Sequence, residues 1–319
     1  MSTIQKALEK FQQQTALPAT GEILTPHENA SPPGHSRQMH AEPGDTPPMN
    51  REQERIHRLA LDQLRQLGIL TPDATRSQLA EEYRLIKRPL LLNVDRKGAD
   101  IVDNANLIMV TSALPGEGKT FTAINLAMSI AMEQDRTVLL VDGDVAKPTA
   151  AKRLGIDAEQ GLIDILAGST LSIADVLVRT DIPNMRVMPA GSKHERATEL
   201  LASERMTRIM EELSTRYRDR IVIFDSPPLL LSSESAALAA MMGQIIMVVA
   251  AEQTLQHVAA DALSRLGRDK IKGLVLNKYR ASLGNRYGTG YGYGYGYGYG
   301  YGHSQDAAAS PSRPVQAAG

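Results

Sequence analysis

The sequence predicts an α/β fold in which helices cover both faces of a mostly parallel sheet. From residue 106 onward, short β-branched or aliphatic runs alternate with helical segments. Continuous apolar strands are typical of a sheet that is buried on both faces, and strands separated by helices are typical of parallel pairing. The predicted strands are residues 107–111, 137–141, 186–188, 221–224, 245–249 and 274–276.

Helical periodicity accompanies these strands. A helix over residues 121–132 is expected directly after the first strand. Two more are expected before the sheet, over residues 51–67 and over Ser77 to Arg88, with Pro89 ending the second.

The two ends of the chain differ in composition from its centre. Residues 15–50 hold seven of the 17 prolines, and residues 287–302 are almost entirely Gly and Tyr. Such segments bury too little apolar surface to offset the entropy lost on ordering them. We therefore expect a short amphipathic helix in residues 1–14, a disordered linker in 15–50, one globular domain with N-terminal helices in 51–279, and a disordered tail in 280–319.

Charge and cysteine content exclude several classes of function. The chain has 35 Lys and Arg against 36 Asp and Glu, a net charge of −1 that gives no long-range attraction to nucleic acid. It has no cysteine, which excludes disulfides and thiolate chemistry. Neither a secretory signal nor an apolar run long enough to span a bilayer is found, so we expect a cytoplasmic protein.

A phosphate-binding loop is predicted between the first strand and its helix. Residues 113–120 read Ala-Leu-Pro-Gly-Glu-Gly-Lys-Thr, the P-loop pattern with Ala in place of the first Gly. Glycines let the backbone amides wrap a phosphate at a helix N-terminus, and the expected fold becomes a P-loop NTPase. Lys119 would reach the β- and γ-phosphates and the Thr120 hydroxyl would ligate Mg²⁺. The expected nucleotide-binding residues are Pro115, Gly116, Glu117, Gly118, Lys119, Thr120 and Phe121.

Acidic residues end two further predicted strands. Asp142 and Asp144 follow one, and Asp225 follows another. A lone aspartate at the end of a strand is more often a helix cap, but three at one sheet edge beside a P-loop indicate a cation site. We expect Thr120, Asp142 and Asp225 to hold Mg²⁺.

Seven tyrosines stand in the predicted tail. Each is flanked by glycine on at least one side, and by itself such a tail could be merely a sticky low-complexity segment. Beside a nucleotide site it becomes a candidate phosphate acceptor, because a glycine-rich coil of 9 to 23 residues wanders roughly 15 to 30 Å. The expected acceptors are Tyr287, Tyr291, Tyr293, Tyr295, Tyr297, Tyr299 and Tyr301.

These motifs resemble those of the bacterial P-loop tyrosine autokinases of exopolysaccharide biosynthesis. Residues 81–91 and 106–122 are most similar to the subgroup encoded at exosortase-linked loci, and the likeness covers about residues 75–280 and the tail. The resemblance implies ATP and Mg²⁺ as cofactors, Lys119 with Asp142 or Asp144 as catalytic residues, and an adenine contact from Asn277. It also relates the chain to partition-type ATPases.

The resemblance implies partners as well. They are a separate membrane polysaccharide co-polymerase, a cognate tyrosine phosphatase, and other copies of the chain in a ring assembled through Glu81, Arg84 and Lys87. The co-polymerase would hold the kinase at the inner face of the membrane. Two departures stand out, because Ala146 followed by Lys147 occupies the place of a family arginine, and Lys87 that of another.

Two other functions fit the same residues. A partition or positioning ATPase shares the fold and most motifs, although its second loop lysine is Leu114 here. A nucleotide-gated adaptor would use the tail only to recruit partners. Neither alternative transfers phosphate to the tyrosines.

Overall fold

The computed structural model describes residues 56–74, 76–98, 102–216, 220–267 and 270–279. The predicted N-terminal helix in residues 1–14, the linker in 15–50 and the tail in 280–319 lie outside these residues. Within the described residues, the strands are β1 (Leu107–Ser112), β2 (Thr137–Asp142), β3 (Val178–Arg179), β4 (Met185–Met188), β5 (Arg220–Asp225), β6 (Gln244–Ala250) and β7 (Ile271–Asn277).

Helices separate most of these strands along the chain. They are α2 (Leu61–Gln66), α3 (Gln78–Val94), α4 (Lys119–Ala131), α5 (Ala150–Arg153), α6 (Leu162–Leu166), α7 (Ile173–Val176), α8 (Ala197–Leu201), α9 (Glu204–Thr215), α10 (Ser233–Met241) and α11 (Gln256–Ser264).

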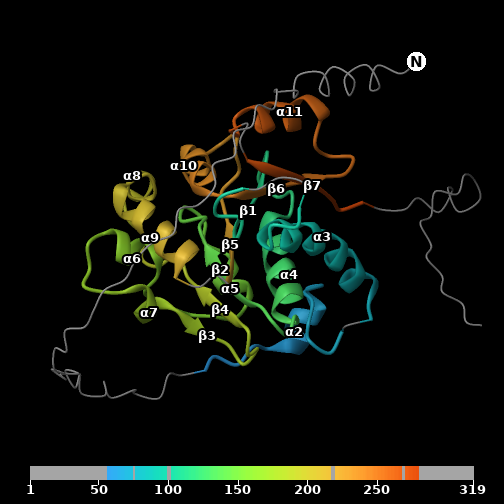
Figure 1. Ribbon diagram of the computed structural model, residues 1–319, viewed down its shortest axis with the longest axis horizontal. Coiled ribbons are helices and arrows are strands. Elements are labelled where there is room, and N and C mark those ends of the chain that lie inside the picture. Colours follow the sequence, from blue (N-terminus) through green and yellow to red (C-terminus); the bar gives the residue numbers. More distant parts are fainter. Residues whose placement is uncertain (1–55, 75, 99–101, 217–219, 268–269, 280–319) are drawn as a thin grey trace, which may run out of the picture. The chain divides into compact units, whose positions relative to one another are not determined.

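The strands form one sheet in the order β3-β4-β2-β5-β1-β6-β7 (Figure 1). Every neighbouring pair is parallel except β3 with β4. The sheet therefore matches the predicted class, and only the two-residue edge strand β3 was missed. It is too short to leave a periodic pattern in the sequence.

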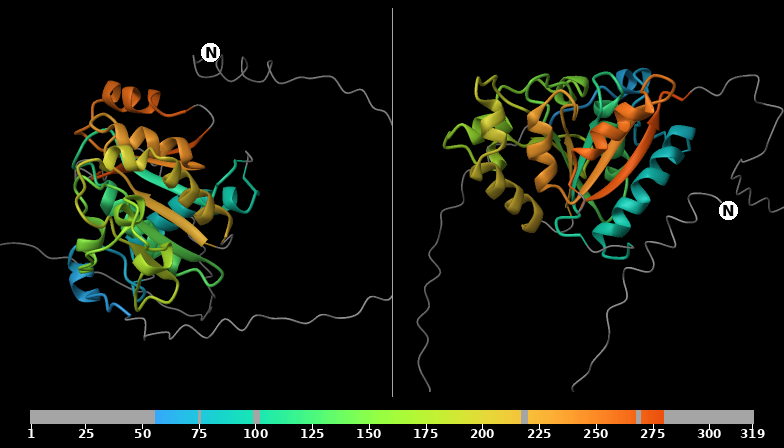
Figure 2. Two further views of the ribbon diagram at one scale, coloured as in Figure 1. Left: turned by 90° about the vertical axis from the view of Figure 1, so that its left-hand side faces the viewer. Right: turned by 90° about the horizontal axis from the view of Figure 1, so that it is seen from above.

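Two apolar cores pack against the sheet, one on each face. Figure 2 shows the helices that lie on the two sides of the sheet. Alternate residues of β1 point to opposite sides, because side chains alternate along a strand: Ile108 belongs to the core under α2 to α5, and Met109 to the core under α6 to α11. Both are fully buried. This two-sided burial explains why the strands read as unbroken apolar runs.

The predicted helix over residues 51–67 is wrong for half of its described length. Residues 51–55 are not described, and helix α2 begins only at Leu61. Before it the chain is extended along β3, where His57 N donates to Arg179 O at 2.8 Å and Asp181 N donates to His57 O at 3.0 Å. These tertiary hydrogen bonds satisfy the backbone groups that a helix would have paired.

Helix α3 continues past Pro89 to Val94, so the predicted end at residue 88 is also wrong. A proline inside a helix leaves the carbonyl four residues earlier without a partner. Here that residue is Leu85, which is 73% exposed, so water can reach the carbonyl. Beyond the proline, Leu90 and Leu91 pack on the core and favour continuing the helix.

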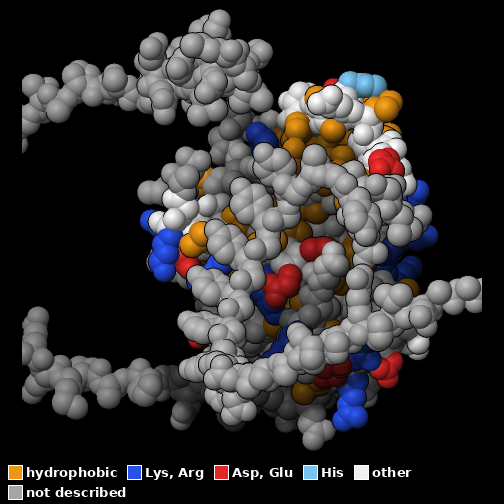
Figure 3. Space-filling model, turned by 90° about the vertical axis from the view of Figure 1, so that its right-hand side faces the viewer, with side chains coloured by type: hydrophobic (Ala, Val, Ile, Leu, Met, Phe, Trp, Pro, Cys, Tyr) orange, Lys and Arg blue, Asp and Glu red, His pale blue; other side chains and the backbone are white. Residues whose placement is uncertain are grey.

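Strand β7 forms one edge of the sheet and leads into the undescribed tail. Leu274 and Leu276 on this strand are exposed. Figure 3 shows the side of the molecule that carries β7 and α3, where hydrophobic side chains gather between charged ones. No helix in the described parts of the chain is long and apolar enough to cross a membrane.

Candidate active site

The predicted phosphate loop joins β1 to α4. Gly116 and Gly118 have φ angles of +81° and +105°, a left-handed conformation that favours glycine. Gly118 is the N-cap residue of α4, so the amides of the loop and the first helical turn face the same space. This is the backbone geometry that a phosphate group requires.

The side chain of Glu117 stabilises the conformation of the phosphate loop. The Glu117 side chain is only 4% exposed, and it accepts a hydrogen bond from Leu114 N at 2.7 Å and another from the Thr254 hydroxyl. Glu117 therefore shapes the loop from within, in addition to its predicted place in the nucleotide-binding segment. The motif alone gives no sign of this role, because position 117 is variable in the P-loop pattern.

Asn277 lies against the same loop from the end of β7. Its Nδ2 donates to Glu117 O at 2.8 Å, and a Cβ atom at Gly118 would approach Asn277 Nδ2 to 1.9 Å. A side chain at 118 would therefore displace the Asn277 amide from the loop, in addition to the unfavourable φ angle. The structure brings Asn277 to the predicted nucleotide site, and its contact with adenine stays a prediction.

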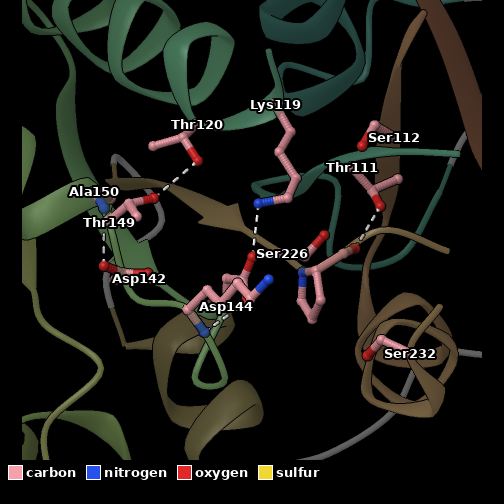
Figure 4. Close-up of polar contacts among 12 residues, drawn as sticks. Thr111, Ser112, Lys119, Thr120, Asp142, Asp144, Thr149, Ala150, Ser226 and Ser232 are labelled. Atoms are coloured by element: carbon pink, nitrogen blue, oxygen red, sulfur yellow. Dashed lines mark hydrogen bonds and ion pairs between the residues drawn. The ribbon is translucent and has the colours of Figure 1, made fainter. Parts of the chain in front are cut away.

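Lys119 and Asp144 face each other across the cleft (Figure 4). Lys119 Nζ donates to Asp144 Oδ2 at 2.6 Å, and Asp144 Oδ1 accepts from Lys147 N at 3.1 Å. Both side chains of the ion pair are nearly buried, at 12% and 6% exposed. In the free protein the Asp144 carboxylate therefore neutralises the Lys119 ammonium, which would pair with the phosphates of a bound triphosphate instead.

The predicted cation ligands also meet at this edge. Strands β2 and β5 are neighbours, and Asp142 stands in register with Asp225 at their carboxyl ends. The Thr120 hydroxyl lies 3.3 Å from that of Thr149 (Figure 4). Thr120, Asp142 and Asp225 are all buried. The expected convergence of these three residues is found.

Asp142 does act partly as a helix cap. Its Oδ2 accepts from Ala150 N at 2.9 Å, at the start of α5. Its Oδ1 and both carboxylate oxygens of Asp225 are buried without a hydrogen-bond partner among the described residues. Buried carboxylate oxygens without partners are costly, and a hard cation is the usual partner for such a set. The residues therefore fit Mg²⁺.

Burial changes the acidity of both carboxyl groups. Burial, together with the nearby negative charge of Asp225, raises the pKa of Asp142 to about 7. Burial also raises the pKa of Asp225 to about 6, although the Lys119 ammonium and the Thr120 hydroxyl act in the opposite direction. The cluster thus carries negative charge in a place where only a cation would stabilise it.

No group of three or more His, Asp or Glu side chains within the described ranges is arranged to hold a metal ion by itself. Mg²⁺ characteristically takes one or two carboxylates and completes its octahedron with substrate phosphates and water. The arrangement is therefore suited to Mg²⁺ that arrives together with a nucleotide.

The cleft in front of these residues measures about 470 Å³. Its lining joins the P-loop to Lys147 and Arg153, after β2, and to the turn after β5. Ala146, at the place of the family arginine, also lines the cleft. Arg153 is on no motif, so only the tertiary structure shows that a guanidinium stands near the phosphate site.

The residues predicted for assembly line one surface groove on α3 but differ in exposure. Glu81 and Arg84 form an exposed ion pair on α3. Lys87 is only 8% exposed, and its Nζ donates to Ser129 O at 2.6 Å and pairs with Glu133 at 2.5 Å. Lys87 therefore fastens α3 to α4 within the domain, whereas the ion pair of Glu81 and Arg84 is exposed.

Comparison with known proteins places this site in a family. Residues 105–268 match the family described as AAA domain. The chain is 37% identical over 175 residues to the tyrosine-protein kinase Wzc of Salmonella typhimurium, covering 54% of this chain and 24% of Wzc. It is 29% identical over 226 residues to the tyrosine-protein kinase YwqD of Bacillus subtilis, covering 70% of this chain and 91% of YwqD.

A solved structure agrees with these relatives. The crystal structure of the VpsO kinase domain is similar with a TM-score of 0.54 and 31% identity, covering 69% of this chain and 98% of that domain. The chain spans about a quarter of the length of several curated relatives, Wzc among them. From its AAA domain, its phosphate loop and these relatives, the chain belongs to the bacterial P-loop tyrosine kinases.

Proposed function

We propose that the protein transfers the γ-phosphoryl group of ATP to tyrosine hydroxyls. The observation that carries this proposal is the acid cluster beside the loop, next to Lys119 and Thr120. Three buried carboxylate oxygens of Asp142 and Asp225 have no hydrogen-bond partner there among the residues that the structure describes. Phosphoryl transfer depends mainly on positioning and charge neutralisation, and this cluster supplies sites for both. The tyrosine kinases among the relatives support tyrosine as the acceptor.

Each residue has a distinct part. The loop amides and Lys119 bind the β- and γ-phosphates, which displace Asp144 from the lysine. Thr120, Asp142 and Asp225 are the residues that would hold Mg²⁺, which neutralises phosphate charge when bound. Asp144 lines the cleft whereas Asp142 is fully buried beneath it, so Asp144 is the better placed to orient or deprotonate the tyrosine hydroxyl. Asn277 contacts the adenine.

The acceptors are the protein's own tail tyrosines, Tyr287, Tyr291, Tyr293, Tyr295, Tyr297, Tyr299 and Tyr301. Tethering holds them at a local concentration on the order of millimolar. The activity regulates exopolysaccharide polymerisation and export through a separate membrane co-polymerase, which brings the kinase to the inner face of the membrane. Copies assemble into a ring, and a cognate phosphatase resets the tail.

The test is loss of phosphotyrosine in Lys119→Met. Intact-mass spectrometry of the wild type should show a ladder of phosphorylated species that is absent from this variant. Lys152→Met is the matched control, because Lys152 is exposed on α5 and does not line the cleft, and it should keep the ladder. An unchanged ladder in Lys119→Met would refute the proposal. A wild type that binds and hydrolyses ATP without any phosphotyrosine would instead indicate a positioning ATPase.

A further inference from the structure

The turn after β5, residues 227–231, is fixed to the phosphate-binding strand; we name it the β5 turn. Thr111 Oγ1 and Ser235 Oγ donate to Pro227 O at 2.9 and 2.6 Å. Leu229 N donates to Ser112 O at 2.8 Å, and the Arg265 guanidinium donates to Leu229 O at 3.3 Å. Hydrogen bonds from β1, α10 and the segment after α11 therefore hold the turn in one conformation.

This anchored turn presents an apolar surface to the cleft. Pro227 and Pro228 line the cleft and are otherwise buried, and Leu231 lines it while 66% exposed. Burial of a leucine side chain is stabilising, and Leu231, which is mostly exposed, gains little of this free energy by itself. A ligand that covers Leu231 would recover that free energy without any rearrangement of the turn.

The composition of the cleft determines what can cover Leu231. Lys119 and the loop amides occupy one part and select phosphate, whereas the β5 turn offers no charged side chain. Asp144 lines the cleft as well and accepts hydrogen bonds. A ligand that fits both features has a flat apolar body with a hydroxyl group at its far end, and tyrosine is the side chain of that description.

The tail of this protein offers that side chain and almost nothing else. Residues 287–301 consist of tyrosine and glycine except for one threonine, so the tyrosine ring is the principal group by which the tail can be recognised. We propose that the β5 turn is the acceptor subsite, in which Leu231 and Pro228 hold the ring of a tail tyrosine from a second copy of the chain. This inference rests on the proposed function.

The phosphoryl transfer at this subsite forms one bond to the γ-phosphorus and breaks another. The tyrosine Oη forms a bond to the γ-phosphorus, and the bond from that phosphorus to the β,γ-bridging oxygen breaks. The electron pair leaves on ADP, and the phenolic proton passes to the Asp144 carboxylate. Leu231 touches only the ring, so it is expected to affect acceptor binding and to leave nucleotide binding unchanged.

A kinetic experiment separates these effects. Full-length Lys119→Met protein with a mass tag serves as the acceptor, and its phosphorylation by wild type, Leu231→Ala or Leu231→Met is measured over a range of acceptor concentrations. We expect Leu231→Ala to raise the KM for the acceptor by about tenfold, the equivalent of 1.4 kcal/mol of lost ring contact. Leu231→Met should restore most of the affinity, because methionine offers a similar apolar area.

Two controls keep the outcomes apart. Leu255→Ala removes a leucine that is 61% exposed but lies outside the cleft, and it should leave the KM unchanged. A fluorescent ADP analogue should bind every variant with the same Kd. A Leu231→Ala enzyme whose KM stays within twofold of wild type would overturn the acceptor subsite alone. A wild type that phosphorylates no acceptor would overturn the proposed function and the subsite with it.

Discussion

At the scale of single residues, the site is organised around charges that the free protein cannot fully satisfy. Asp144 neutralises Lys119, but three buried oxygens of Asp142 and Asp225 have no partner in the described structure. These buried carboxylate oxygens lower the stability of the free protein, and the binding of a cation and phosphate would raise it. Because the pKa values of Asp142 and Asp225 are raised, this loss of stability can be measured through its pH dependence.

The pH dependence of stability follows from Asp225. Its pKa is about 6 in the folded protein against 3.8 for an ordinary aspartate, so between these values the folded state retains a proton that the unfolded state loses. Stability therefore falls as pH rises from about 4 to 6 and the loss persists above. In the presence of EDTA and without nucleotide, Asp225→Asn should raise the free energy of unfolding at pH 8 by on the order of 2 to 3 kcal/mol.

Thermal unfolding is the measurement. A gain of that size corresponds to roughly 4 to 12 °C in Tm for a domain of this length. Near pH 3, below both pKa values, the Asp225 carboxyl group is protonated in the folded and in the unfolded protein, and the two proteins should unfold within about 2 °C of each other. With Mg²⁺ and ADP present, the wild type should gain more than the variant. A variant less stable than wild type at pH 8 would contradict the assignment of Asp225 as an uncompensated charge.

At the scale of elements, helix α3 carries residues with two different tasks. Lys87 joins α3 to α4, the helix that begins at the phosphate loop, and Glu81 with Arg84 stays at the surface. The resemblance to the kinase family implies that Glu81, Arg84 and Lys87 act together in assembly. Burial distinguishes them, because the Lys87 side chain is buried and paired inside the domain whereas the Glu81–Arg84 ion pair is exposed, and their role in assembly stays a prediction.

Two substitutions on α3 should therefore behave differently. Lys87→Ala removes charged hydrogen bonds inside the domain and should lower the free energy of unfolding by about 2 to 3 kcal/mol. Arg84→Ala breaks an exposed pair and should change it by less than about 0.5 kcal/mol. Urea unfolding at one pH measures both. If Glu81 and Arg84 mediate assembly, Arg84→Ala should instead reduce the mass measured by light scattering, and a large loss of stability in Arg84→Ala would contradict this division.

At the scale of the whole molecule, net charge links the tail to assembly. The chain carries a net charge of −1, and each phosphotyrosine adds about −1.5 to −2. Seven modified tyrosines would add roughly −10 to −14, which is large against that balance. Repulsion between tails of neighbouring copies should loosen any ring, since like charges destabilise a compact assembly.

Light scattering at two salt concentrations tests this effect. Phosphorylated wild type in low salt should have a lower mass per particle than Lys119→Met at the same concentration. At about 1 M salt, where charges are screened beyond about 3 Å, the difference should shrink. The same mass for both proteins in low salt would show that tail charge does not control assembly.

The local sequence was sufficient for the sheet, the phosphate loop and the acid cluster. Apolar runs, glycines at 116 and 118, and aspartates at strand ends are signals that lie within a few residues of the structure they produce. Parallel strands place their carboxyl ends together whatever the loops between them do, which is why Asp142 and Asp225 could be expected to meet. Predictions from the local sequence were wrong where contacts between distant residues opposed the local secondary-structure preference.

Only the tertiary structure decided the remaining features, because each depends on groups far apart in the chain. The extended segment at His57 pairs with β3, more than a hundred residues later, and α3 passes Pro89 because the core beneath it rewards further burial. Lys87 turned inward, and Leu231 came to line the same cleft as Asp144, for the same reason. Long-range packing free energy exceeds the propensity of a few residues, and no local pattern records it.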